Sequence, residues 1–236
     1  MKYVEKSRRG AYLLAGFAGM FLCGVGDILL SYRGESGEST VGGMMTTGIA
    51  DVPQGVYIAS FFIGVIAAFG YWLGARAMYS QLCDTPSAAA HGRLMKLFSA
   101  GGTLFSMGLF GIHSVCCMAL MALQSAARAG LSAAEIDKYF ALPMLLPFTV
   151  TTLWQTLADI FAAIPFIVLV AKGEIKAPKA SIVYGPICLF VIFNIIKAAL
   201  TAAGMGSAAH FFAGGETWGL SFMFLTMYFV GRKEDI

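Results

Sequence analysis

The stretch FLCGVGDILL at residues 21–30 sets one carboxylate, that of Asp27, into a long apolar segment near the start of the chain. An ionisable side chain at membrane depth costs about 2.5–3.5 kcal/mol on insertion scales. Such a group is normally kept only where a partner or a water-filled cavity receives it. Asp27 therefore predicts that other polar side chains are buried beside it.

The composition indicates a membrane protein. Of the 236 residues, 58% are hydrophobic and 12% are charged, whereas soluble domains carry about 25% charged residues. The formal net charge of +3 is small, and no basic run with interleaved aromatic residues is present. We therefore expect an integral membrane protein whose partner is membrane lipid, and the composition excludes a nucleic-acid partner.

Six apolar segments are each long enough to cross about 30 Å of hydrocarbon at 1.5 Å per helical residue. They lie at approximately residues 11–32, 54–80, 94–124, 144–171, 181–204 and 207–231. Small residues such as Gly16 and Gly19 permit close approach between neighbouring helices. The sequence predicts an all-α integral membrane protein, a six-transmembrane-helix bundle that forms a single membrane domain over residues 1–236.

The basic residues orient this bundle because loops on the cytoplasmic side carry the excess of Lys and Arg. One side of the expected bundle has Lys2, Lys6, Arg8, Arg9, Arg76, Arg93, Lys96, Lys172, Lys176, Lys179, Arg232 and Lys233. The other side has only Arg33, Arg128, Lys138 and Lys197. The pattern predicts that both termini are cytoplasmic, in a bacterial-type plasma membrane.

Two connections on the outer side have features of their own. Residues 33–53 are rich in Gly, Ser and Thr, and a loop of this length is often a lid or a disordered tether. Residues 125–143 contain Ser132 and Glu135 at the spacing of a capping box. We expect a short interfacial helix to follow Ser132 and to end before Pro143.

The expected topology places the buried polar residues at one depth, in the outer half of the bilayer. They are Asp27, His113, Gln155, Asp159, Asn194, Lys197, His210 and Glu216. Gln155 and Asp159 are four residues apart, so they lie on one helix face. A shared depth lets these side chains meet. It predicts a polar cavity, open to the outside, to which Gln155, Asn194 and Lys197 contribute.

Metal-assisted catalysis is one chemistry that this set could support. Asp27, His113 and His210 are the ligand types of a catalytic zinc ion with an open position, and Glu216 or Asp159 could then act as a base. One alternative is a Ser or Cys nucleophile beside His113. A second is a proton relay, and a third is a strut in which Asp27 or Asp159 pairs with Lys197.

The clustering of polar residues in one half of the bilayer favours an enzyme. We expect a hydrolase-like membrane enzyme that acts on a lipid or amphiphile, with Asp27, His113, His210, Glu216 and Asp159 as its catalytic residues and zinc as the candidate cofactor. A small-molecule or ion-coupled transporter is the alternative, because buried acids and histidines also serve carriers. A non-catalytic membrane assembly module is the second alternative.

Overall fold

The computed structural model describes residues 3–34, 36–85 and 91–234, with side chains as far as Arg232. The helices are α1 (Lys6–Ser31), α2 (Gln54–Cys83), α3 (Gly92–Arg128), α4 (Ala133–Ala171), α5 (Pro186–Ala202), α6 (Gly206–Ala209) and α7 (Gly215–Glu234). Three 3-10 turns accompany them, η1 (Thr47–Asp51), η2 (Lys179–Ile182) and η3 (His210–Phe212). The strands β1 (Ser39–Thr40) and β2 (Met45–Thr46) form a small antiparallel hairpin. The all-α fold is confirmed.

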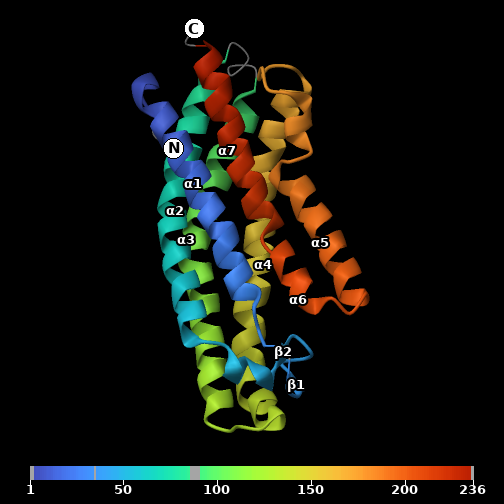
Figure 1. Cartoon of the computed structure of the whole chain (residues 1–236). Helices are drawn as coiled ribbons and strands as arrows, with labels where there is room; N and C mark the ends of the chain where they lie inside the picture. Colours follow the sequence, from blue (N-terminus) through green and yellow to red (C-terminus); the bar gives the residue numbers. More distant parts are fainter. Residues whose placement is uncertain (1–2, 35, 86–90, 235–236) are drawn as a thin grey trace.

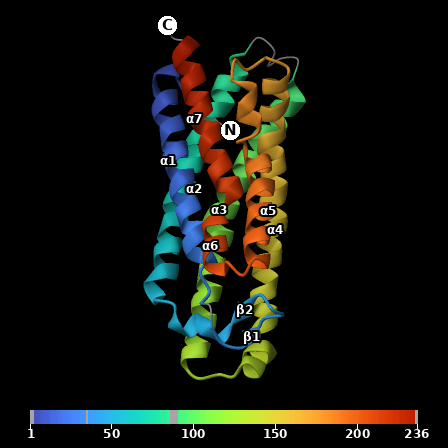
Figure 2. The ribbon, with the colours of Figure 1, turned by 45° about the vertical axis from the view of Figure 1, so that its right-hand side comes forward.

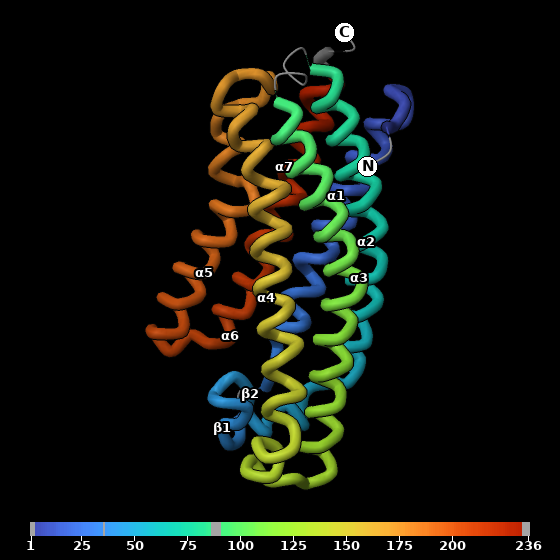
Figure 3. The backbone as a smooth tube through the Cα atoms, turned by 180° about the vertical axis from the view of Figure 1, so that it is seen from behind, coloured from blue at the N-terminus to red at the C-terminus, as the bar shows by residue number. Residues whose placement is uncertain are grey.

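The long helices run along a common axis, and α1 and α7 lie side by side (Figures 1 and 2). α1 begins and α7 ends at the same end of the bundle, which we call the termini end. The β1–β2 hairpin lies at the opposite end, the hairpin end, where α3 and α4 extend beyond the other helices (Figure 3). Lys2, which contributed to the predicted orientation, lies outside the described residues.

Four helices of the described chain, α1 to α4, are long and apolar enough to cross a membrane by length and composition. α5 is also apolar but has only 17 residues. These helices agree with four of the six predicted segments in position. The differences lie in three places: the start of α4, residues 33–53 and the last third of the chain.

The start of α4 corrects the prediction of a separate interfacial helix that ends before Pro143. The capping box of Ser132 and Glu135 is formed as expected, but the helix then continues without interruption to Ala171. Proline interrupts backbone hydrogen bonding, yet membrane helices tolerate it where neighbouring structure stabilises the helix. Here Ile136 and Met144, on either side of Pro143, are both fully buried in a small hydrophobic core.

The connection over residues 33–53, for which a lid, a disordered tether and an ordinary loop were the alternatives, packs through residues 36–53 against the extended ends of α3 and α4. Val41, Met45, Ile49 and Val52 are buried in the same small core as Ile136. Polar contacts hold the segment in its middle and near its end. Thr40 Oγ1 donates a hydrogen bond to Asp137 Oδ1 at 2.7 Å, and Arg128 Nη2 donates one to Val52 O at 2.8 Å. The segment therefore forms a fixed cap over the hairpin end.

The last two predicted segments differ most from the structure. Residues 179–182 form η2, and α5 starts only at Pro186, where proline suits the first helical turn. The expected helix over 207–231 is interrupted. α6 and η3 end at Phe212, Ala213 is extended, Gly214 has φ +69°, and α7 begins at Gly215. This interruption brings the start of α7 into the middle of the bundle.

The bundle is held by close helix contacts and by one polar clamp. A methyl group on Gly16 of α1 would lie 2.8 Å from the Cα of Gly74 in α2, so no larger residue fits this contact. At the termini end, Arg9 Nη1 donates to Asp84 Oδ2 at 2.7 Å, and Tyr3 OH donates to Asp84 Oδ1 at 2.8 Å. Partial burial alone would raise the pKa of Asp84, but the bonds from Arg9 and Tyr3 outweigh it and hold the pKa below its ordinary value.

Candidate functional site

The interrupted helix positions Asp27. The side chain leaves α1 one turn before its end and meets the first turn of α7. There the single hydroxyl hydrogen of Thr217 has two acceptors, Asp27 Oδ2 at 3.0 Å and Gly214 O at 2.7 Å. A Cβ on Gly214 would lie 2.5 Å from Asp27 Oδ2, so only glycine leaves room for the carboxylate. The partial positive charge at a helix N-terminus favours a carboxylate in this position.

His113 of α3 forms the second wall of the site. Its Nδ1 lies 3.9 Å from Asp27 Oδ1, the separation of an ion pair when the imidazole is protonated. Its Nε2 lies 3.1 Å from Ser60 O and 3.2 Å from Ser60 Oγ of α2. Ser60 Oγ donates to Gly26 O at 2.9 Å, so both Ser60 oxygens are acceptors for the ring. Nε2 therefore carries a proton, and Nδ1 faces Asp27.

Asp27, His113 and Ser60 are the residue types of an acid–histidine–serine catalytic triad. Ser60, however, is not accessible as a nucleophile. Ser60 is fully buried, and its hydroxyl hydrogen is committed to the backbone of α1. A nucleophile must be exposed to its substrate and must be able to give its proton to the base. Ser60 is therefore a positioning residue that fixes the histidine ring. Gly64, one turn further along α2, leaves the space that this ring occupies.

A second carboxylate group lies beside the first. Gln155 Nε2 of α4 donates a hydrogen bond to Glu216 Oε1 in the first turn of α7 at 2.6 Å. Asp159, one turn beyond Gln155 on the same face of α4, is 8% exposed. Its Oδ1 is buried and has no hydrogen-bond partner among the described residues. Two acids, Glu216 and Asp159, thus stand on either side of the Gln155 amide.

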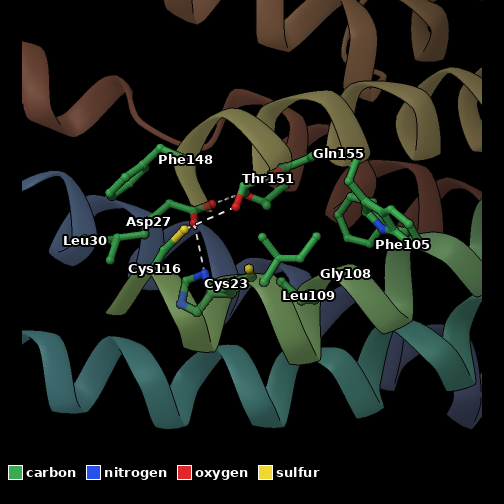
Figure 4. A pocket seen from close by; sticks show the side chains of 14 residues that line it. Cys23, Asp27, Leu30, Phe105, Gly108, Leu109, Cys116, Phe148, Thr151 and Gln155 are labelled. Carbon is green, nitrogen blue, oxygen red and sulfur yellow. Dashed lines mark hydrogen bonds and ion pairs between the residues drawn. The ribbon is translucent and has the colours of Figure 1, made fainter. Parts of the chain in front are cut away.

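Three adjoining cavities surround these side chains. The central cavity, of about 120 Å³, lies between α1, α3, α4 and α7, and Figure 4 shows Asp27, Cys116 and Thr151 pointing into it. It is mostly apolar, with Phe105, Leu109 and Phe148 in its walls. Asp27 is the carboxylate that reaches it, and 19% of the Asp27 side chain is exposed.

The other two cavities lie along α5. The lateral cleft, of about 250 Å³, separates α4 from α5 and is lined by Gln155, Asp159, Ile160, Ile187, Phe190 and Glu216. The end cavity, of about 300 Å³, lies nearer the hairpin end and is lined by Asp27, Arg33, Asn194, Lys197, Gly214 and Glu216. Because Asp27 and Glu216 each line more than one cavity, the three cavities meet at this pair of carboxylates.

The structure brings together most of the predicted polar set. Asp27 lies with His113, Glu216 lies with Gln155 and Asp159, and the end cavity adds two of the three remaining members, Asn194 and Lys197. In the described part of the chain, the side chain within ion-pair distance of the Asp27 carboxylate is that of His113, which is cationic only when protonated, and not that of Lys197. Asn194 itself donates to Phe190 O at 2.8 Å.

His210 is the member that does not join. It lies in η3, before the interruption, where its ring is 5.9 Å from the ring of Tyr32 and its carbonyl accepts a weak bond from Ser31 Oγ at 3.4 Å. Within residues 3–34, 36–85 and 91–234, no three His, Cys, Asp or Glu side chains gather as metal ligands. The predicted zinc set of Asp27, His113 and His210 is therefore not assembled here.

Some residues of the site could not be found from the sequence. Ser60 and Gly64 are small residues in an apolar helix and carry no pattern that distinguishes them from helix-packing positions. Thr217 likewise has no motif around it. The glycine pair Gly214 and Gly215 is different, because two adjacent glycines in an expected helix indicate a point where it can be interrupted. The interruption at this pair allows Glu216 to turn toward the other polar residues.

The fold and the site together define an all-α helical bundle of strongly apolar helices with ionisable side chains inside it. The chain belongs to a family of unknown function, DUF6796, whose model matches residues 1–234. Comparison with curated proteins and with solved structures gives no match. The function must therefore be argued from the site itself.

Replacing Thr217 tests whether its hydroxyl stabilises the Asp27 carboxylate in this position. Thr217→Val keeps the shape of the side chain but removes the hydroxyl donor from a buried carboxylate, which we expect to lower the free energy of unfolding by about 1–3 kcal/mol. The measurement is thermal unfolding of the purified protein in detergent. Thr217→Ser, which keeps the hydroxyl, is the matched control. Equal stability of the Val and Ser variants would contradict this role.

Proposed function

We propose that the chain crosses the membrane six times, with α5 and α7 as the fifth and sixth spans and both termini in the cytoplasm of a bacterial-type plasma membrane. Six crossings agree with the common end at which α1 begins and α7 ends. α5 would extend over roughly 26 Å, slightly less than the hydrocarbon thickness. The excess of basic residues at the termini end supports the orientation.

A cysteine-accessibility measurement in intact cells tests this topology. We expect a single cysteine at exposed Arg8, in a cysteine-free background, to resist a membrane-impermeant maleimide until the cells are opened. A single cysteine at exposed Gly42 in the cap should react from outside, because the two sites lie at opposite ends of the bundle. The reverse labelling pattern, or equal labelling of both sites, would contradict the proposal.

We further propose that the protein is a membrane enzyme that binds an amphiphile from the bilayer in the outer half of the bundle and acts on its polar head. The lateral cleft is the observation that supports this proposal most directly. Phe190 and Thr156 on its two sides are exposed on the flank of the bundle, where lipid would lie, while Glu216 and Asp159 stand at its polar floor. An amphiphile has the same division into an apolar chain and a polar head.

The chemistry that these residues could perform is proton transfer by carboxylates. A carboxylate that meets a bound molecule in a water-poor cavity can take a proton from an attacking water or give one to a leaving group, which typically contributes 10²–10⁴-fold to a rate. Asp27 and Glu216 are the candidates because both reach the end cavity. His113 would balance the charge of Asp27. A hydrolase-like reaction needs no nucleophile from the protein in this arrangement.

The packing toward the termini end supports an enzyme over an open path across the membrane. Tyr71, Phe98, Phe166 and Phe224 are fully buried there. The ring centroids of Tyr71 and Phe105 are 4.4 Å apart, and those of Tyr71 and Phe224 are 5.6 Å apart. Aromatic packing of this kind closes the bundle toward the termini end and leaves the lateral cleft and the end cavity as the routes to the polar site.

An ion-coupled carrier is the second candidate, and the interruption between η3 and α7 favours it. Discontinuous helices whose N-termini face an ionisable group occur at the binding sites of many transporters. Asp27 against the first turn of α7 has this arrangement. A carrier would require the aromatic packing around Tyr71 to open, whereas an enzyme would work with this packing closed. A purely structural assembly module would require no opening of the packing and no chemistry at the carboxylates.

Replacing Glu216 tests the enzyme. Full-length protein in nanodiscs is incubated with a labelled total lipid extract from bacterial membranes, and the products are analysed by mass spectrometry. We expect the wild type to convert one amphiphile class and Glu216→Gln to lose at least 100-fold in rate. The variant should fold, because the amide oxygen of the introduced glutamine can still accept the bond from Gln155. Glu5→Gln, which makes the same change at an exposed site, is the matched control.

Unchanged turnover in Glu216→Gln would contradict the proposed role of the carboxylate. Accumulation of an unmodified solute inside wild-type proteoliposomes, without product formation, would favour the carrier. If no amphiphile is retained, converted or transported, the assembly module is the remaining interpretation.

A further inference from the structure

The lateral cleft contains an acceptor that nothing in the described protein satisfies. Asp159 is 92% buried, since its relative exposure is 8%, and its Oδ1 has no hydrogen-bond partner among the described residues. A buried polar atom without a partner is destabilising, and a charged one is more so. An unpartnered buried polar atom in a native protein calls for an explanation, and a donor from a bound molecule is a simple one.

The surroundings of Asp159 indicate where such a donor would come from. Asp159 lines the lateral cleft, as do Gln155 and Glu216. The other lining residues are Thr152, Thr156, Ile160, Pro186, Ile187 and Phe190. No cationic side chain is among these lining residues, and the nearby cations Arg33 and Lys197 line the end cavity instead. Glu216 shares the end cavity with these cations, whereas Asp159 lines the lateral cleft, where no cationic side chain is among the lining residues.

An ammonium group supplies both a hydrogen-bond donor and a positive charge. It brings a positive charge to Asp159 and Glu216, and its N–H groups can donate to the carboxylate of Asp159, which lines the cleft. A quaternary ammonium brings the charge but no donor, and an anionic head would face two acids. The exposed ring of Phe190 at the edge of the cleft can add a cation–π contact. Ile160, Pro186 and Ile187 give the cleft an apolar part that suits a hydrocarbon chain.

We propose that the molecule bound in the lateral cleft is an amphiphile with a primary or secondary amine head, which Asp159 holds by a charge-assisted hydrogen bond while the chain extends between α4 and α5. This inference rests on the proposed function, because it names the substrate class of the same site. It assigns Asp159 to substrate binding, and it leaves the proton transfer to Asp27 and Glu216.

The inference is tested by binding of defined probes to the full-length protein in phosphatidylcholine nanodiscs. The probes are dodecylamine, dodecyltrimethylammonium and dodecyl sulfate, and the readouts are the thermal midpoint and direct binding by native mass spectrometry. We expect dodecylamine to bind at least tenfold more tightly than dodecyltrimethylammonium, because only the amine has N–H donors. Dodecyl sulfate should give no specific binding.

Variants locate the binding. Asp159→Asn should weaken dodecylamine binding at least tenfold, and Asp159→Glu should restore part of it. Asp51→Asn, the same change at an exposed carboxylate of η1, is the matched control and should bind like the wild type. The thermal midpoint without a probe verifies that Asp159→Asn is folded, and we expect it to be at least as stable as the wild type because the unpartnered charge is removed.

Equal dodecylamine binding by wild type and Asp159→Asn would overturn the inference, and would point to a donor from within the core, such as the buried Tyr71 hydroxyl. Equal binding of the two cationic probes would overturn it as well. The proposed function fails separately: if the lipid extract is converted but amines do not bind, only the head-group assignment is lost. If neither occurs, the proposed enzyme is lost too.

Discussion

The carboxylate of Asp27 lies against the first turn of α7, and the arrangement of the half of the bundle nearer the hairpin end follows from this contact. Thr217 supplies a hydroxyl, the helix N-terminus supplies partial positive charge, and Gly214 supplies the space. A continuous helix over 207–231 would provide neither a free N-terminus nor a glycine turn at this depth. The interruption of the last helix thus accommodates the carboxylate that the first helix carries into the bundle.

The same interruption creates the cavities around Asp27. Because α7 starts in the middle of the bundle, Glu216 enters from its first turn and meets Gln155 of α4. α5 packs mainly on α7 and leaves the lateral cleft on its α4 side. His113 closes the opposite wall and is fixed by Ser60. Two acids thus line the lateral cleft, and a third lies beside the histidine.

The sequence predicted those features that depend on composition and on helix period. The apolar segments became helices, and the buried polar residues at one depth largely met, because helix length fixes depth. The features that depend on tertiary packing could not be predicted. α4 continues through Pro143 because the cap of residues 33–53 buries Ile136 and Met144 on either side of it. His210 was expected beside Asp27, but it precedes the turn at Gly214 and stays with Tyr32.

The most direct measurement of the central claim is an electron cryomicroscopy structure of the protein in nanodiscs of native lipid. The account predicts that Asp27 contacts Thr217 at an interrupted last helix, and that elongated density enters between α4 and α5 with its head beside Asp159 and Glu216. A continuous last helix, with Asp27 paired to Lys197 and α5 closed onto α4, would contradict it.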